Sequence, residues 1–256
     1  MIKKRQVLIV GNWKMFPKTI DEARSIIRMM ERVLKNTKKI AMVVCPPALF
    51  VADIARHAHK KKSVSIGVQN IHQEVEGAHT GDISARQSMS VGAKYVIIGH
   101  AERRAIGETD IAVQQKTFLA VTTGLTPIVC VGEKERDAQG AYLDFVNSQI
   151  TSAMALVPQH MRSRIIFAYE PLYAIGAPKP PAEHDIHQMI LSIRKMLHAA
   201  HGPSIGRTVR VLYGGAVDTS NAQKLFEAIP ELSGFLIGRA SVDPEKCEPL
   251  LRSFLA

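Results

Sequence analysis

Short apolar runs alternate along the chain with longer amphipathic segments. The apolar runs have the length of buried strands and lie at about residues 6–11, 39–44, 64–68, 94–98, 126–131, 164–169, 208–212 and 234–237. Between most of them the apolar residues recur at helical spacing, as in residues 19–35 and 184–199. We expect Thr19 or Lys18 to begin the first of these helices. The pattern therefore predicts strands and helices in alternation.

This alternation favours one particular class of fold. Strands that alternate with helices in units of roughly 30 residues pair in parallel through right-handed crossovers. Eight such units in 256 residues fit a closed (β/α)8 barrel better than an open doubly wound sheet. No linker, low-complexity tract or break in composition interrupts them. We therefore expect residues 1–256 to form a single α/β barrel domain with its helices outside.

Side chains of catalytic type follow several of the apolar runs directly. Asn12 and Lys14 come after the first run, His100 after the fourth and Glu170 after the sixth, and the pair Gly214–Gly215 follows the seventh. The carboxyl ends of the strands in a parallel barrel open on one mouth, where the active sites of this fold lie. We therefore expect these distant residues to meet in one site.

Three of these side chains have a specific chemistry to offer. Glu170 precedes Pro171, which prevents the next ladder hydrogen bond, and a carboxylate shielded there by apolar neighbours can act as a base. His100 precedes a segment that can open a short helix, and a helix N-terminus favours a neutral imidazole. Lys14 can neutralise an anionic substrate. The plain alternatives are a solvent-facing carboxylate, a histidine in a loop network and a solvated lysine.

Glycines add an anion site to this picture. Gly176 lies in the loop after Glu170, and Gly214–Gly215 and Gly238 follow the last two strands. Glycines let backbone N–H groups approach a bound anion, and the loops after strands seven and eight are the usual phosphate site of such barrels. Turn formation explains any one of these glycines alone, but their joint occurrence predicts a phosphate site.

The net charge of +10 favours anionic binding partners but does not indicate a nucleic-acid-binding protein. The basic residues are spread over the chain without aromatic interleaving or a nucleic-acid-binding motif, so we expect anionic small molecules and no nucleic acid. No apolar run has the length of a membrane span. The basic start leads into a strand-sized run rather than a signal-peptide core. We therefore expect a cytoplasmic protein without membrane attachment.

Metal and cofactor signals are weak. Cys45, Cys130 and Cys247 are too few and too scattered for a disulfide framework or a metal cluster, and the first two are expected to be buried, inert thiols. His184 and His187 are one helical turn apart but lack further ligands, so we interpret them as surface residues. Nucleotide fingerprints are absent from the sequence. We expect no metal and no cofactor.

Several segments together resemble the triosephosphate isomerase family over essentially the whole length of the chain. They are GNWKM at 11–15, GVQN at 67–70, GAHTGDIS at 77–84, GHAERR at 99–104, YEP and AIG within 169–176, and LYGG at 212–215. The resemblance implies a TIM barrel. It also implies an isomerase of glycolysis and gluconeogenesis that interconverts dihydroxyacetone phosphate and D-glyceraldehyde 3-phosphate through an enediolate, without metal or cofactor.

The resemblance further implies a role for each catalytic residue. Glu170 takes the proton from the carbon beside the substrate carbonyl, while neutral His100 polarises the carbonyl and moves protons between the two oxygens. Lys14 and Asn12 bind the substrate and stabilise negative charge. Glu102 would lie next to Asn12 and Lys14 without contacting the substrate itself.

Phosphate binding and assembly follow from the same resemblance. Backbone amides of Gly176, Ala216, Gly238 and Arg239 would hold the phosphate. Residues 70–84 resemble the loop that inserts into a partner subunit, with its tip at residue 80, which implies a homodimer.

The chain departs from the family mainly around phosphate and lid. Ala101 and Ala216 replace serines, Tyr173 replaces a tryptophan and Arg239 replaces a glycine. Prolines 178, 180 and 181 replace a glycine-containing lid, so we expect a stiffer lid. Arg239 either contacts phosphate or points outward. An isomerase of a four-carbon ketose phosphate therefore remains an alternative. A barrel that only binds sugar phosphates is disfavoured, because it would not need the base.

Overall fold

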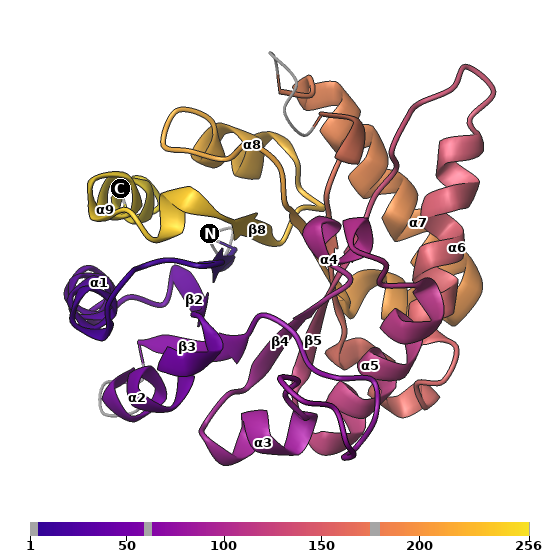
Figure 1. The fold of residues 1–256 in the computed structure, drawn as a ribbon. Coiled ribbons are helices and arrows are strands. Elements are labelled where there is room, and N and C mark those ends of the chain that lie inside the picture. Colours follow the sequence, from indigo (N-terminus) through magenta and orange to yellow (C-terminus); the bar gives the residue numbers. More distant parts are fainter. Residues whose placement is uncertain (1–4, 59–62, 175–179, 256) are drawn as a thin grey trace.

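The strands form one closed parallel barrel in the computed structural model, which describes residues 5–58, 63–174 and 180–255 (Figure 1). Each predicted apolar run forms one strand, and the strands in order are β1 (Val7–Asn12), β2 (Ile40–Cys45), β3 (Val64–Val68), β4 (Tyr95–Ile98), β5 (Thr126–Val131), β6 (Ile166–Tyr169), β7 (Arg210–Tyr213) and β8 (Gly234–Ile237). Every strand pairs in parallel with the next, and β8 closes on β1. The predicted fold class is confirmed.

The helices surround the barrel as an outer ring, apart from the short α4, which lies nearer the centre of the barrel (Figure 1). They are α1 (Ile20–Val33), α2 (Ala48–Ala58), α3 (Ala85–Ser90), α4 (Ala101–Ala105), α5 (Asp110–Thr123), α6 (Ala141–Met154), α7 (Glu183–Thr208), α8 (Ala222–Ala228) and α9 (Pro244–Ser253). Short 3-10 turns add η1 (Gln159–Arg164), η2 (Leu172–Ala174) and η3 (Arg239–Ser241). Helices α9 and α1 pack side by side, so the two ends of the ring meet.

Two helix boundaries show how local chemistry sets the elements. Thr19 caps α1, and its side chain accepts a hydrogen bond from the Glu22 backbone N–H. Helix α7 runs beyond the predicted end at residue 199, but it breaks at Gly202, whose φ is 85°. Pro203 follows and suits the first turn of the second helical stretch. This added stretch occupies residue 208, so β7 begins two residues later than predicted.

The core has two layers because both faces of every strand are covered. On β1, Leu8 and Val10 point into the barrel, while Val7 and Ile9 pack against the helices. This double burial explains why the strands are continuous apolar runs rather than alternating ones. The three cysteines are buried, as predicted for Cys45 and Cys130.

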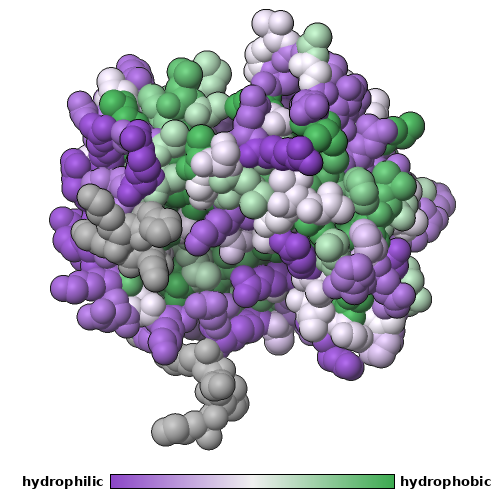
Figure 2. All heavy atoms as spheres, turned by 90° about the horizontal axis from the view of Figure 1, so that it is seen from below, coloured by the Kyte–Doolittle hydropathy of each residue, from purple (hydrophilic) through white to green (hydrophobic). Residues whose placement is uncertain are grey.

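The outer surface is mixed rather than uniformly apolar. Figure 2 shows the face that lies lowest in Figure 1, where hydrophilic residues surround several apolar patches. Two of the exposed large apolar side chains, Met15 and Leu49, are each 91% exposed. None of the helices in the described ranges is both long enough and apolar enough to cross a membrane.

Candidate active site

A cavity of about 590 Å³ opens at the carboxyl ends of the strands. It gathers the predicted site residues from β1, β4, β6, β7 and β8, namely Asn12, Lys14, His100, Glu102, Glu170, Gly214, Gly215, Ala216, Gly238 and Arg239. Gly176 and most of the predicted lid lie outside the described residues, so their roles stay predictions. The cavity thus joins residues that are up to 227 positions apart, counted from Asn12 to Arg239.

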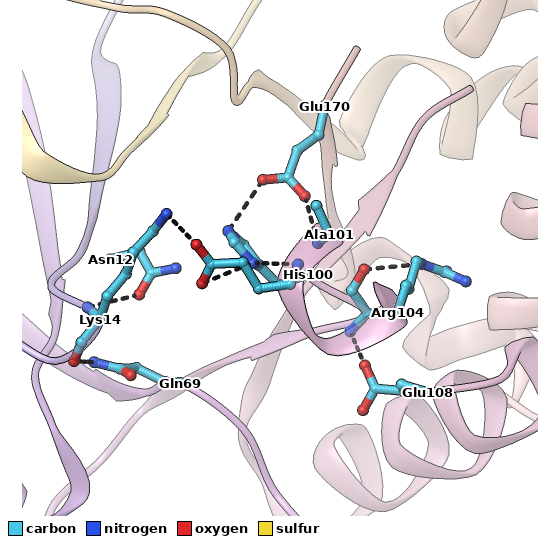
Figure 3. Close-up of polar contacts among 10 residues, drawn as sticks. Asn12, Lys14, Gln69, His100, Ala101, Arg104, Glu108 and Glu170 are labelled. Atoms are coloured by element: carbon cyan, nitrogen blue, oxygen red, sulfur yellow. Dashed lines mark hydrogen bonds and ion pairs between the residues drawn. The ribbon is translucent and has the colours of Figure 1, made fainter. Parts of the chain in front are cut away.

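Glu170 is buried at the end of β6, which excludes the solvent-facing interpretation. Its carboxylate points toward His100 and Ala101 (Figure 3): Oε1 lies 3.2 Å from His100 Nε2, and Oε2 accepts a hydrogen bond of 3.1 Å from the Ala101 N–H. Burial raises the pKa of Glu170, although His100 and the Ala101 N–H partly offset this effect. The side chain is therefore a strengthened base, and it faces the cavity.

His100 caps the N-terminus of α4, as the sequence predicts. Its Nδ1 accepts a hydrogen bond of 3.2 Å from the Glu102 backbone N–H. A backbone N–H can only donate, so Nδ1 carries no proton and the neutral ring holds its proton on Nε2. That Nε2–H faces the Glu170 carboxylate at 3.2 Å. The imidazole is thus arranged as a neutral hydrogen-bond donor toward the cavity.

The residue before His100 is held from both sides, a feature that the sequence analysis missed. Gly99 N–H donates to Glu108 Oε2 at 2.9 Å, and Gly99 C=O accepts from Arg104 Nε at 2.9 Å (Figure 3). Glu108 in turn forms an ion pair with the buried Lys116. Gly99 has a φ of 70°, a conformation that favours glycine. The strand end that carries the histidine is therefore rigidly placed.

Lys14 has a left-handed backbone with a φ of 54°. Such a conformation costs of order 1–3 kcal/mol in a non-glycine residue, so the surroundings must impose it. Asn12 Oδ1 accepts from the Lys14 N–H at 3.2 Å, and Gln69 Nε2 donates to the Lys14 carbonyl at 2.8 Å. Gln69 lies in a segment that matches the family, but its position between two strand ends was visible only in the structure.

The Lys14 ammonium lies beside the cavity against Glu102. Its Nζ is 2.6 Å from Glu102 Oε1. Desolvation alone would raise the pKa of Glu102, but the hydrogen bond and the charge of Lys14 outweigh it and hold that pKa below its usual range. Both side chains are partly exposed, so a substrate anion can reach the ammonium.

Another part of the cavity rim is built from the loops after β7 and β8. A Cβ at position 215 would lie 2.1 Å from the Tyr213 hydroxyl, so glycine is required there. The buried Tyr213 hydroxyl has no hydrogen-bond partner among the described residues. Arg239 is exposed, and its guanidinium carbon lies 6.0 Å from the centroid of the Phe16 ring. This geometry fits the outward interpretation of Arg239, with its backbone left at the rim.

Fold and site together define a barrel enzyme with a buried carboxylate base, a neutral imidazole and an ammonium around one cavity. The sequence profile of the triosephosphate isomerase family matches residues 7–254. The triosephosphate isomerase of Chloroflexus aurantiacus is 39% identical over 92% of this chain and 94% of its own length. That of Carboxydothermus hydrogenoformans is 37% identical over 97% and 98%. The chain belongs to the triosephosphate isomerase family.

Proposed function

We propose that the protein interconverts dihydroxyacetone phosphate and D-glyceraldehyde 3-phosphate, a step of glycolysis and gluconeogenesis in the cytoplasm, with residues 1–256 as one catalytic domain. The observation that carries the proposal is the pair formed by Glu170 and His100. Their reactive atoms lie 3.2 Å apart and face a cavity that also holds Lys14. A carbonyl compound bound in the cavity beside them would meet a base and a hydrogen-bond donor at once.

The proton transfer proceeds through an enediolate. The Glu170 carboxylate takes a proton from the carbon beside the substrate carbonyl, and the electron pair of that C–H bond moves onto the carbonyl oxygen. His100 Nε2–H donates to this oxygen and then moves a proton between the two oxygens. Glu170 returns its proton to the neighbouring carbon. Atoms and charge balance, because the base is restored and the substrate is only isomerised.

Charge and shape support the binding of a phosphorylated substrate. Lys14 lies beside the enediolate position and offsets the developing negative charge, while Asn12 holds the backbone of Lys14. The phosphate would sit at the rim formed by Gly215, Gly238 and the backbone of Arg239. Position 238 lies close to the Lys14 side chain, because a Cβ built there would be in van der Waals contact with Lys14 Cε at 3.6 Å.

We also infer a homodimer through residues 70–84. Exposed apolar side chains occur in the segments after four consecutive strands, β1 to β4: Met15, Leu49, Val75 and Ile106, with exposed fractions of 91%, 91%, 44% and 74%. Because these strands are neighbours in the barrel, the side chains lie in one sector of its mouth. An apolar sector of this kind is typical of a protein–protein contact.

Sedimentation velocity tests the dimer. Leu49→Arg should shift the protein toward monomer at low concentration, because it places a charge in the inferred contact. Leu156→Arg is the matched control, since this side chain is 49% exposed and follows α6. A wild-type protein that sediments as a monomer would contradict the inference.

The activity is tested in a coupled isomerase assay that offers three-carbon and four-carbon sugar phosphates in parallel. The wild type should convert the three-carbon substrate preferentially, and Glu170→Gln should lose about 10²–10⁴-fold in kcat. If the wild type preferred the four-carbon substrate, the proposed substrate would be wrong and the protein would be an isomerase of a four-carbon ketose phosphate. Binding of both phosphates without turnover would leave only a sugar-phosphate-binding barrel.

A further inference from the structure

Arg136 lies beside the strand end that carries Glu170, but the proposed reaction gives it no role. It belongs to the segment after β5, and its side chain is 19% exposed. Its guanidinium contacts four other parts of the chain: the end of β6, η2, the start of α6 and the start of α7. This position is on the side of β5 to β7, whereas the inferred dimer contact lies in the sector of β1 to β4. The contacts of Arg136 therefore stand apart from that interface.

The buried Glu133 holds this arginine in place. The Glu133 side chain is 1% exposed, and its Oε1 accepts from Arg136 Nε at 2.8 Å and from the Tyr169 hydroxyl at 2.9 Å. Burial and the charge of Glu133 raise the pKa of Tyr169, so the hydroxyl keeps the proton that it donates. Among the described residues Arg136 is the only ion-pair partner of Glu133. The pair is therefore held together, because leaving one of two buried charges without its partner is costly.

The guanidinium contacts residues on both sides of Glu170. Arg136 Nη2 donates to the Tyr169 hydroxyl at 3.1 Å. The guanidinium carbon lies 5.0 Å from the centroid of the Tyr173 ring, which is within the range of a cation–π contact. Tyr169 directly precedes Glu170, and Tyr173 follows it by three residues. Arg136 thus touches both ends of the short stretch that carries the base.

The remaining contacts tie the same guanidinium to two helices. Arg136 Nη1 donates to Asp185 Oδ1 at 3.1 Å, and Nη2 donates to the Asp185 carbonyl at 3.4 Å, near the start of α7. The ring of Tyr142, near the start of α6, has its centroid 5.1 Å from the guanidinium carbon. These contacts fix the orientation of the guanidinium plane as well as its position.

Beyond Glu170 the chain leaves the sheet. The Glu170 N–H still donates to the Val131 carbonyl of β5 at 2.8 Å, but Pro171 has no N–H with which to continue the ladder. The Tyr173 N–H then donates to the Glu133 carbonyl at 3.2 Å. The segment after β5, which carries Arg136, therefore determines where the chain runs after the base.

We propose that Arg136 is a positioning residue of the isomerase reaction, which fixes the Glu170 carboxylate by holding Tyr169 and Tyr173 on either side of it. The inference rests on the proposed function, because it concerns the base of that reaction. Arginine suits this role better than lysine, since its planar guanidinium directs five N–H groups along fixed directions whereas an ammonium is a point charge. A base that is displaced by about 1 Å can lose about 10²-fold in rate.

Steady-state kinetics of Arg136→Lys in the coupled isomerase assay tests the proposal. Lysine keeps a positive charge beside Glu133 but cannot bond to Tyr169 and Asp185 in the same geometry. We expect kcat to fall at least about tenfold while KM changes less than about threefold, because the base is displaced and the phosphate rim is left intact.

Arg164→Lys is the matched control. Arg164 lies just before β6, at the end of this strand that is opposite to Glu170. It donates from Nη1 to the Val121 carbonyl at 3.1 Å and from Nη2 to the Gly124 carbonyl at 2.9 Å. The same substitution here removes the geometry of a guanidinium without touching the base, so kcat should stay at the wild-type value.

Two readouts separate positioning from a general loss of stability. In Arg136→Lys the acid limb of the kcat/KM profile should move to lower pH, because a displaced Glu170 is less buried and its pKa falls toward the ordinary value. Hydrogen–deuterium exchange without substrate should show faster exchange of the Tyr173 amide. Tyr173→Leu removes the ring but keeps the pair of Glu133 and Arg136, and it should lose kcat to a similar extent even if Arg136→Lys does not fold.

Wild-type kcat in folded Arg136→Lys would overturn the proposal, as would wild-type kcat in Tyr173→Leu if Arg136→Lys does not fold. An equal loss of kcat in Arg164→Lys, or a loss in Arg136→Lys without any change in pH profile or amide exchange, would show a merely structural role. A wild type that does not isomerise triose phosphates would instead contradict the proposed function. The exchange measurement needs no substrate, so it would still decide whether Arg136 holds the stretch around Glu170.

Discussion

Replacing Glu108 by glutamine tests how the fold holds the strand end that carries His100. The Glu108 and Lys116 side chains are 3% and 6% exposed and form an ion pair. Lys116 Nζ also donates to Asn70 Oδ1 at 2.9 Å, and Glu108 Oε2 accepts from the Gly99 N–H at 2.9 Å. The glutamine keeps an oxygen for Gly99 but removes the charge that balances the buried ammonium.

The size of the effect follows from burial. Removing one partner of a buried ion pair costs about 3–5 kcal/mol, because the remaining charge is left without compensation. At about 2–4 °C per kcal/mol for a chain of this size, Glu108→Gln should lower Tm by roughly 6–20 °C. Glu183→Gln is the matched control, since Glu183 Oε2 lies 3.4 Å from Lys224 Nζ and the side chains are 42% and 77% exposed. It should cost less than about 1 kcal/mol.

Equilibrium unfolding in guanidinium, followed by circular dichroism at one protein concentration, measures the free energy of unfolding of both variants. Adding Lys116→Met to Glu108→Gln should recover part of the loss, because the double variant no longer buries an uncompensated charge. If Glu108→Gln were as stable as Glu183→Gln, the buried pair would not hold this strand end and the reasoning from burial would fail.

Four further predictions concern the active site. Gly132→Ala should lower kcat/KM at least tenfold in the coupled assay, because its Cβ would lie 1.8 Å from the Glu170 carbonyl oxygen; unchanged kinetics would contradict this. The raised pKa of Glu170 means that kcat/KM should fall with decreasing pH at values above the ordinary glutamate pKa of about 4.3. The folded state also binds the Glu170 proton more tightly than the unfolded state does, so folding stability is lost as pH rises through the folded pKa. At pH 8 Glu170→Gln should therefore unfold at no lower temperature than the wild type. Arg239→Gly should change KM less than tenfold, whereas a larger rise would place the guanidinium on the phosphate.

The barrel could be predicted because its strands are continuous apolar runs that can be recognised in the sequence. The first run, for example, is apolar on both faces over residues 7–10, which only a doubly covered parallel strand requires. The positions of His100 and Glu170 followed, because strand ends of a parallel barrel share one mouth. The break at Gly202 was missed, because the apolar helical spacing stops there and the following stretch looked like part of the connection to the next strand.

Contacts between loops could not be predicted in the same way. Gln69 reaches the Lys14 carbonyl across two strand ends, and Glu108 reaches Gly99 from the segment between two helices. Neither contact leaves a periodic signal, since irregular backbone directs these side chains. The contacts of Arg136 were missed for the same reason: only the folded segment after β5 brings its guanidinium to Tyr169 and Asp185.

The central claim is that the Glu170 carboxylate moves a proton at the carbon beside the substrate carbonyl. Incorporation of solvent deuterium at that carbon, followed by NMR in D₂O, measures this step directly. The wild type should incorporate deuterium during turnover, and folded Glu170→Gln should do so about 10²–10⁴-fold more slowly. Exchange at the wild-type rate in folded Glu170→Gln would contradict the account.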